Sequence, residues 1–79
     1  MNRDITDPKY LSFFGSKVAA ARHARGEKED TVAKAIGLTR SSLSKIENGK
    51  YESLKITLVI ELCRYLELQW SDLYPPLNT

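Results

Sequence analysis

The chain has 79 residues, of which 42% are hydrophobic and 28% charged, with a formal net charge of +2. This length suits one domain, residues 1–79, and leaves no room for a second. No apolar run approaches the roughly 18 residues of a membrane-spanning helix, and residues 1–10 lack the apolar core of a secretion signal. We therefore expect a cytoplasmic protein that does not enter a membrane.

Cysteine and histidine are too scarce for several kinds of site. With a single cysteine, Cys63, the chain cannot form an internal disulfide, and Cys63 and His23 together cannot supply the four ligands of an ordinary zinc site. Ser41, Ser42 and Lys45 contain the elements of a serine–lysine nucleophile pair, but so short a chain supplies no pocket or oxyanion site around them. We expect no catalytic residue, no metal, no cofactor and no small-molecule ligand.

The first predicted helix begins at Asp7 and Pro8, because Asp is a favoured N-cap residue and Pro is favoured at the next position. Apolar residues then recur at spacings of three and four, at Leu11, Phe14, Val18 and Ala21. Gly26 is expected to end this helix. Gly15, inside it, is expected only to cost about 1 kcal/mol relative to alanine.

Two shorter helices are predicted next, over residues 28–36 and 40–48. Two acidic residues in the first turn of the former suit the positive end of a helix dipole, and Gly37 ends it. Thr39 is a suitable N-cap for the latter, and Gly49 a suitable stop.

A fourth helix is expected to be capped by Ser53, with an apolar stripe that continues to Leu66, and a last turn covers residues 70–73. Residues 57–62 are rich in β-branched side chains, but the helical period runs through them, so no strand is predicted. The expected fold class is all-α, a compact bundle of four to five short helices, with tails at 1–7 and 75–79.

Residues 29–48 have the pattern of a helix-turn-helix. Ala33 is a small residue where the two helices cross, and Gly37 lies where the turn favours positive φ. The aliphatic residues that anchor the motif to the core are Leu38, Leu43 and Ile46. With Leu43 and Ile46 inward, the opposite face of helix 40–48 carries only cations, hydroxyls and an amide. Such a helix suits a DNA major groove, where donors meet base edges and phosphates. A plain amphipathic surface helix is the alternative, which the turn pattern disfavours.

One pair of charges is predicted to join two helices. Arg22 continues the apolar stripe of the first helix, and Glu47 follows Leu43 by four residues near the inner side of helix 40–48. Charges in these positions are tolerated when they are paired. We therefore expect a structural Arg22–Glu47 ion pair.

The stretch from Arg22 to Leu73 resembles the DNA-binding domain of the phage-repressor/Cro-like family, also called the XRE family. The most specific part of the match is the run Ile46-Glu47-Asn48-Gly49-Lys50, in register with the turn. The resemblance implies a five-helix, lambda-repressor-like fold, usually dimeric on DNA, and an Arg–Glu pair like the one above. It implies base-reading residues at Arg40, Ser41, Ser42 and Lys45, and phosphate contacts at the start of the second helix and around Asn48 and Lys50.

The start of the second helix departs from the family pattern. The family usually has Ser and then Gln there, whereas this chain has Lys28 and Glu29. A glutamate cannot donate to a phosphate, and Glu27, Glu29 and Asp30 place three acids near the expected phosphate position. Lys28 is the residue expected to reach the DNA backbone in compensation.

These observations favour a sequence-specific regulator of transcription. It is expected to bind a near-palindromic double-stranded operator as a homodimer, with helix 40–48 in the major groove, in the nucleoid-associated part of the cytoplasm. The alternative is a protein-interaction module, such as the antitoxin that partners a toxin. The acidic start of the second helix favours that alternative.

Overall fold

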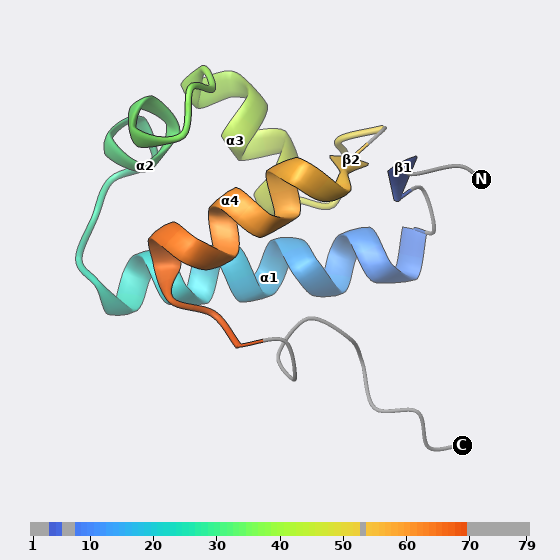
Figure 1. The fold of residues 1–79 in the computed structure, drawn as a ribbon, viewed down its shortest axis with the longest axis horizontal. Coiled ribbons are helices and arrows are strands. Elements are labelled where there is room, and N and C mark those ends of the chain that lie inside the picture. Colours follow the sequence, from blue (N-terminus) through green and yellow to red (C-terminus); the bar gives the residue numbers. More distant parts are fainter. Residues whose placement is uncertain (1–3, 6–7, 53, 70–79) are drawn as a thin grey trace.

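The computed structural model describes residues 4–5, 8–52 and 54–69. Its elements, in chain order, are β1 (Asp4–Ile5), α1 (Pro8–Ala24), α2 (Glu29–Ala35), α3 (Arg40–Glu47), β2 (Leu54–Lys55) and α4 (Ile56–Leu66). Figure 1 shows α2, α3 and α4 on the same side of α1, the longest helix. The α1 helix packs against α3 and α4, and α2 packs against α3. The predicted all-α fold class is confirmed.

The helix boundaries follow the local signals in most places. The α1 helix begins at Pro8, and the helices α1, α2 and α3 are each followed within a few residues by a glycine with positive φ. Residues 57–62 lie within α4, as the helical period predicted. The expected N-cap at Asp7 and the last turn at residues 70–73 lie outside the described residues.

Two predictions about residues 53–55 were wrong. We predicted no strand, but Leu54–Lys55 pairs with Asp4–Ile5 as a short antiparallel ladder. Strands of two residues are too short to show an alternating pattern, and their partners are distant in sequence. We also expected Ser53 to cap the fourth helix. The residues that follow Ser53, Leu54–Lys55, form β2, so α4 begins only at Ile56. Its N-cap residue is Lys55, which makes no side-chain capping hydrogen bond.

The core lies between the helices and draws on all four of them. Among the described residues, no polar or charged residue is completely buried, and the largest fully buried side chains are Phe14, Val18, Val32, Leu43, Leu54, Val59 and Leu62. Cys63 is only half-buried at the edge of this core, and desolvation raises the pKa of its thiol. None of the described helices has the length and hydropathy of a membrane span.

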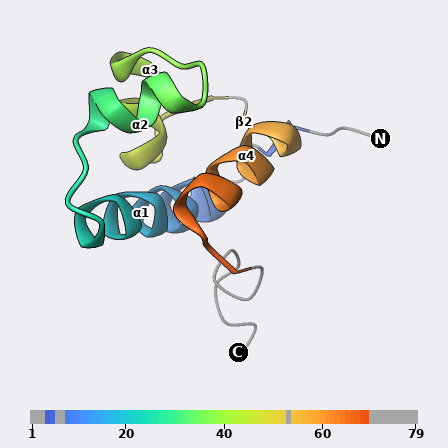
Figure 2. The same ribbon diagram turned by 60° about the vertical axis from the view of Figure 1, so that its left-hand side comes forward.

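The α1 and α3 helices touch through their backbones at Gly15. A Cβ atom at this position would lie 2.2 Å from the carbonyl oxygen of Ile46 and 2.8 Å from that of Glu47. Real Cβ atoms essentially never approach so closely, so a side chain here would push α3 away from α1. Gly15 is therefore more than a mild helix-propensity cost, because it sets the distance between the two helices. Figure 2 shows α2 and α3 together above α1.

The Gly15→Ala variant is expected to lower the free energy of unfolding by about 1–3 kcal/mol, the usual size of an overpacking penalty. Helix propensity alone predicts the opposite sign, a gain of about 1 kcal/mol. Urea denaturation followed by circular dichroism distinguishes the two. A variant more stable than the wild type would contradict the close backbone contact.

Candidate nucleic-acid interface

The turn between α2 and α3 is built by local hydrogen bonds. The backbone N–H of Leu38 donates to the carbonyl of Ala33 at 2.8 Å, and Gly37 between them has a φ of 77°, a conformation that glycine adopts at little cost. The Thr39 hydroxyl then caps α3 by accepting from the backbone N–H of Ser42 at 3.1 Å. The turn therefore fixes where α3 begins relative to α2.

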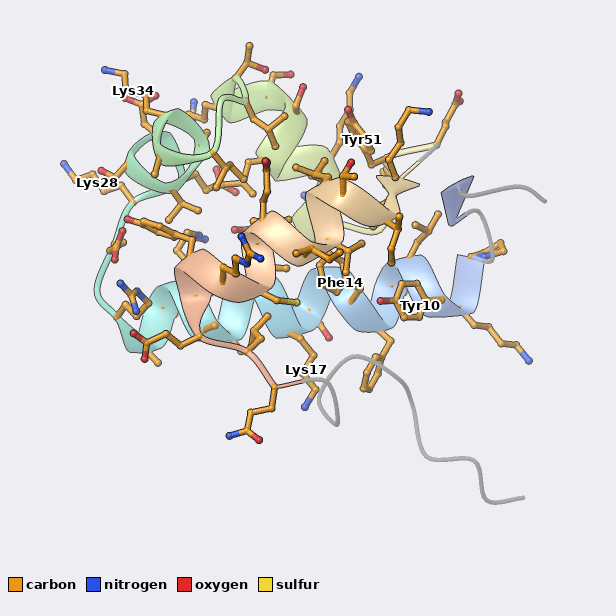
Figure 3. All side chains as sticks on the ribbon, in the orientation of Figure 1. Tyr10, Phe14, Lys17, Lys28, Lys34 and Tyr51 are labelled. Carbon is orange, nitrogen blue, oxygen red and sulfur yellow. The ribbon has the colours of Figure 1, made fainter. Side chains whose placement is uncertain are left out.

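The α3 helix has an apolar inner face and a polar outer face. Leu43 and Ile46 are 0% and 2% exposed, whereas Arg40, Ser41 and Lys45 are exposed. The side chains of α3 reach the edge of the molecule away from α1 (Figure 3). The outer face thus presents two cations and a hydroxyl to solvent.

Ser42 and Asn48 are more constrained than the sequence suggested. The Ser42 hydroxyl accepts a hydrogen bond from Thr39 Oγ1 at 3.1 Å, so this serine is part of the N-cap. Asn48 Nδ2 donates to the carbonyl of Ser44 at 2.9 Å, so the side-chain amide provides a hydrogen bond to a backbone carbonyl in the last turn of α3. Both residues remain at least partly accessible, Ser42 less than Asn48.

Arg22 and Glu47 form a bidentate ion pair between α1 and α3. Arg22 Nε lies 2.7 Å from Glu47 Oε2, and Arg22 Nη2 donates to Glu47 Oε1 at 2.9 Å. The two side chains are only 12% and 5% exposed, and the hydrogen bond to Glu47 raises the pKa of Arg22. Arg22 Nη1 also donates to the carbonyl of Glu27 at 3.0 Å. The pair predicted from the sequence is present, and it ties the α1–α2 loop to α3.

A family model for the helix-turn-helix domain matches residues 14–73. The chain belongs to this family of DNA-binding transcriptional regulators. The phage-repressor/Cro-like resemblance is thereby confirmed.

A solved structure similar to this helix-turn-helix protein is the restriction-modification controller protein C.AhdI from Aeromonas hydrophila. The two chains are 25% identical, the match covers 85% of this chain and 96% of the other, and the TM-score is 0.73. A comparison with curated protein sequences gives no significant match.

The remaining predicted contact residues lie at the two ends of the helix-turn-helix. Lys28 occupies the N-cap position of α2, and its exposed side chain points away from the body of the molecule (Figure 3). Lys50 is exposed just beyond α3 and lines a shallow hollow with Lys45, Tyr51 and Glu52. Tyr51 was not singled out from the sequence: it follows Lys50 directly, but no local pattern places it beside Lys45 as well.

The three acids near the start of α2 have partners within the chain. Glu29 lies 4.0 Å from Arg22 and 3.7 Å from Arg40, and Asp30 lies 4.0 Å from Lys34. Burial, and then the nearby Glu47, raise the pKa of Glu29. The expectation that these acids simply repel a phosphate is therefore incomplete, because intramolecular cations offset part of their charge.

Glu27 in particular does not belong to the interface surface. It accepts hydrogen bonds from the Tyr65 hydroxyl of α4 and from Arg25 Nε, the latter at 2.9 Å, and the Arg25 guanidinium lies 5.2 Å from the centre of the Tyr65 ring. The Tyr65 hydrogen bond, followed by that of Arg25, lowers the pKa of Glu27. This contact holds the α1–α2 loop against α4, and no local signal in the sequence reveals it.

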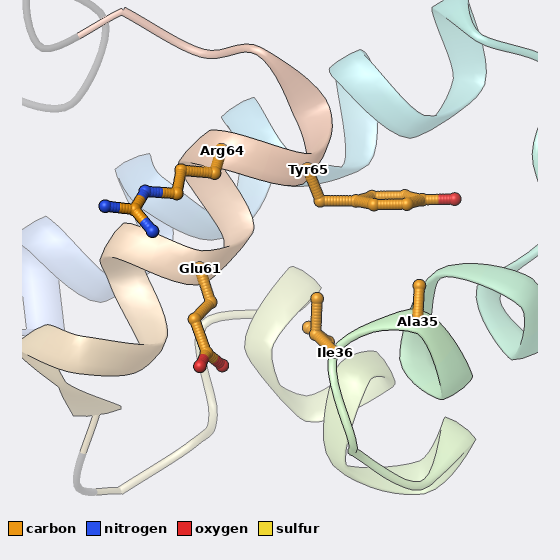
Figure 4. A pocket seen from close by; sticks show the side chains of 5 residues that line it. All are labelled: Ala35, Ile36, Glu61, Arg64 and Tyr65. Atoms are coloured by element: carbon orange, nitrogen blue, oxygen red, sulfur yellow. The ribbon is translucent and has the colours of Figure 1, made fainter.

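Between α2 and α4 lies an open hollow lined by Ala35, Ile36, Glu61, Arg64 and Tyr65 (Figure 4). Its charged groups are one acid, Glu61, and one base, Arg64. Among the described residues, no group of three or more His, Cys, Asp or Glu side chains is placed to hold a metal ion.

Loss of the Arg22–Glu47 pair is expected to weaken the fold strongly. The Glu47→Ala variant should lose about 3 kcal/mol of unfolding free energy, because it leaves a largely buried guanidinium without its partner. The matched control is Asp30→Ala, which removes a carboxylate from an exposed pair and should cost under about 1 kcal/mol. Urea denaturation measures both. Equal losses in the two variants would show that the Arg22–Glu47 pair has no special structural role.

The Glu27 contact predicts a pH dependence. Because the folded-state pKa of Glu27 is lowered, its stabilising effect is present above its unfolded-state pKa and is lost as the pH falls through the folded-state value. The Glu27→Gln variant should therefore melt below the wild type at neutral pH, and this difference should shrink in acid. Melting curves from pH 7 to pH 2 test this. A difference in melting temperature that is constant with pH would contradict it.

Proposed function

We propose that this chain is a sequence-specific regulator of transcription that binds a near-palindromic duplex as a homodimer. Each copy would place α3 in the major groove, and the two α3 helices would lie about 34 Å apart, one turn of the duplex. The observation that carries the proposal is the exposed polar face of α3, which the buried Arg22–Glu47 pair holds in a fixed position.

The roles of the individual residues follow from exposure and chemistry. Arg40 and Lys45 are exposed on α3, and both side chains can donate to the acceptors that guanine presents in the major groove. Ser41 and Ser42 add hydroxyl contacts near the start of the helix. Lys28, Asn48 and Lys50 flank the helix-turn-helix and would bind phosphates, which sets the register of the protein on the duplex.

The similarity to C.AhdI supports a regulatory role, since that protein is named as a restriction-modification controller. Dimerisation is proposed from the phage-repressor/Cro-like resemblance, which implies a domain that is usually dimeric on DNA. The antitoxin alternative rested on the acidic start of α2. Glu29 and Asp30 are partnered within the chain, so that feature no longer argues for a protein partner.

The proposal is tested by selecting preferred duplexes from a random pool and measuring the affinity of lysine variants for them. Lys45→Ala is expected to lose about 1–3 kcal/mol on the preferred duplex and to relax the preference at one base position. Lys50→Ala should weaken binding to preferred and random duplexes alike and reduce the salt slope by about one.

The control is Lys17→Ala, which removes the same charge from α1, where Lys17 points away from α3 (Figure 3). Its affinity for duplex DNA should stay close to that of the wild type. If Lys17→Ala weakened binding as much as Lys45→Ala, DNA binding would depend on net charge rather than on α3. If no duplex bound in a salt-sensitive way, the proposal would be wrong.

A further inference from the structure

Glu29 links the buried ion pair to the exposed start of α3. Its Oε2 lies 4.0 Å from Arg22 Nη2, and its Oε1 lies 3.7 Å from Arg40 Nε. The side chain of Glu29 is 22% exposed, whereas that of Arg40 is 71% exposed. The carboxylate is therefore held on the protein side of the contact, and the arginine extends from it toward solvent.

The Glu29 carboxylate faces two arginines, Arg22 and Arg40, and the carboxylate of Glu47. Arg22 is oriented by two hydrogen bonds to Glu47 and lies at ion-pair distance from Glu29. Glu29 thus lies between a buried cation and an exposed one, on α2, while Arg40 lies on α3. The ion contact crosses the helix-turn-helix at the point where the two helices begin.

We propose that Glu29 is a positioning residue that sets the DNA-sequence specificity of Arg40. An arginine has five N–H donors in a rigid fork, and Glu29 faces the Nε edge, which leaves the terminal nitrogens for the two acceptors of a guanine. Without this restraint, the flexible guanidinium at the end of α3 is free to bind the nearest phosphate, which carries no sequence information. The inference rests on the proposed function.

The negative charge of Glu29, like that of Asp30, opposes the approach of any phosphate backbone, on preferred and random duplexes alike. Its contact with Arg40 is what separates the two kinds of duplex, because it favours one orientation of that side chain. Glu29 should therefore reduce binding to random DNA more than binding to the preferred duplex. The quantity that it controls is the ratio of the two affinities.

The test compares Glu29→Gln with Asp30→Asn. Both variants remove one negative charge from the first turn of α2, but Asp30 is 60% exposed and its ion contact is with Lys34 of the same helix, 4.0 Å away. Dissociation constants are measured on the preferred duplex and on a random duplex of equal length, over a series of salt concentrations. Thermal melting checks that each variant is folded.

Glu29→Gln is expected to bind random DNA more tightly and to lower the specificity ratio by about tenfold, within the range of one bidentate base contact. Its salt slope on random DNA should steepen by about one, since the released Arg40 binds one more phosphate. Asp30→Asn should shift both affinities equally and leave the ratio unchanged. Equal specificity ratios in the two variants would overturn the inference.

An Arg40→Ala background supplies a second, independent comparison. If Glu29 acts through Arg40, adding Glu29→Gln to Arg40→Ala should change the specificity ratio no further. A tenfold loss that persists without Arg40 would overturn the inference while leaving the proposed function intact. A wild-type protein with no preferred duplex would overturn both.

Discussion

The bidentate contact between Arg22 and Glu47 is the interaction on which the placement of α3 depends. A helix of eight residues is too short to be stable by itself in water, and α3 contributes only Leu43 and Ile46 to the core. Its orientation therefore comes from its contacts with α1 and α2. The ion pair holds the C-terminal end of α3, and the missing side chain at Gly15 lets the two backbones meet there.

The charges of the helix-turn-helix divide into an inner group and an outer group. Glu47 and Glu29 are largely buried and both face the guanidinium of Arg22, whereas Arg40, Lys45 and Lys50 are exposed. The inner group gives α2 and α3 a common anchor on α1. The outer group is then available to an anionic surface. The contacts of the inner group with α1 determine where the exposed side chains of the outer group lie.

Much of this arrangement could be predicted from the sequence, because its signals are local. Periodicity gives the helices, Thr39 gives the cap of α3, and the inward positions of Arg22 and Glu47 give the ion pair. The contacts that escaped prediction join residues far apart in the chain, namely Gly15 with the end of α3, Glu27 with Tyr65, and β1 with β2. No spacing rule connects such residues, and for Gly15 the local rule even gives the wrong sign.

The central claim is that α3 and its flanking lysines form the DNA-binding surface. The most direct test is a ¹⁵N-correlated NMR titration of the folded protein with its preferred duplex. The account predicts that the largest backbone shift changes occur at residue 28 and over residues 40–50, with little change around Phe13 and Lys17 on α1. Shift changes concentrated on that part of α1, with none over residues 40–50, would contradict it.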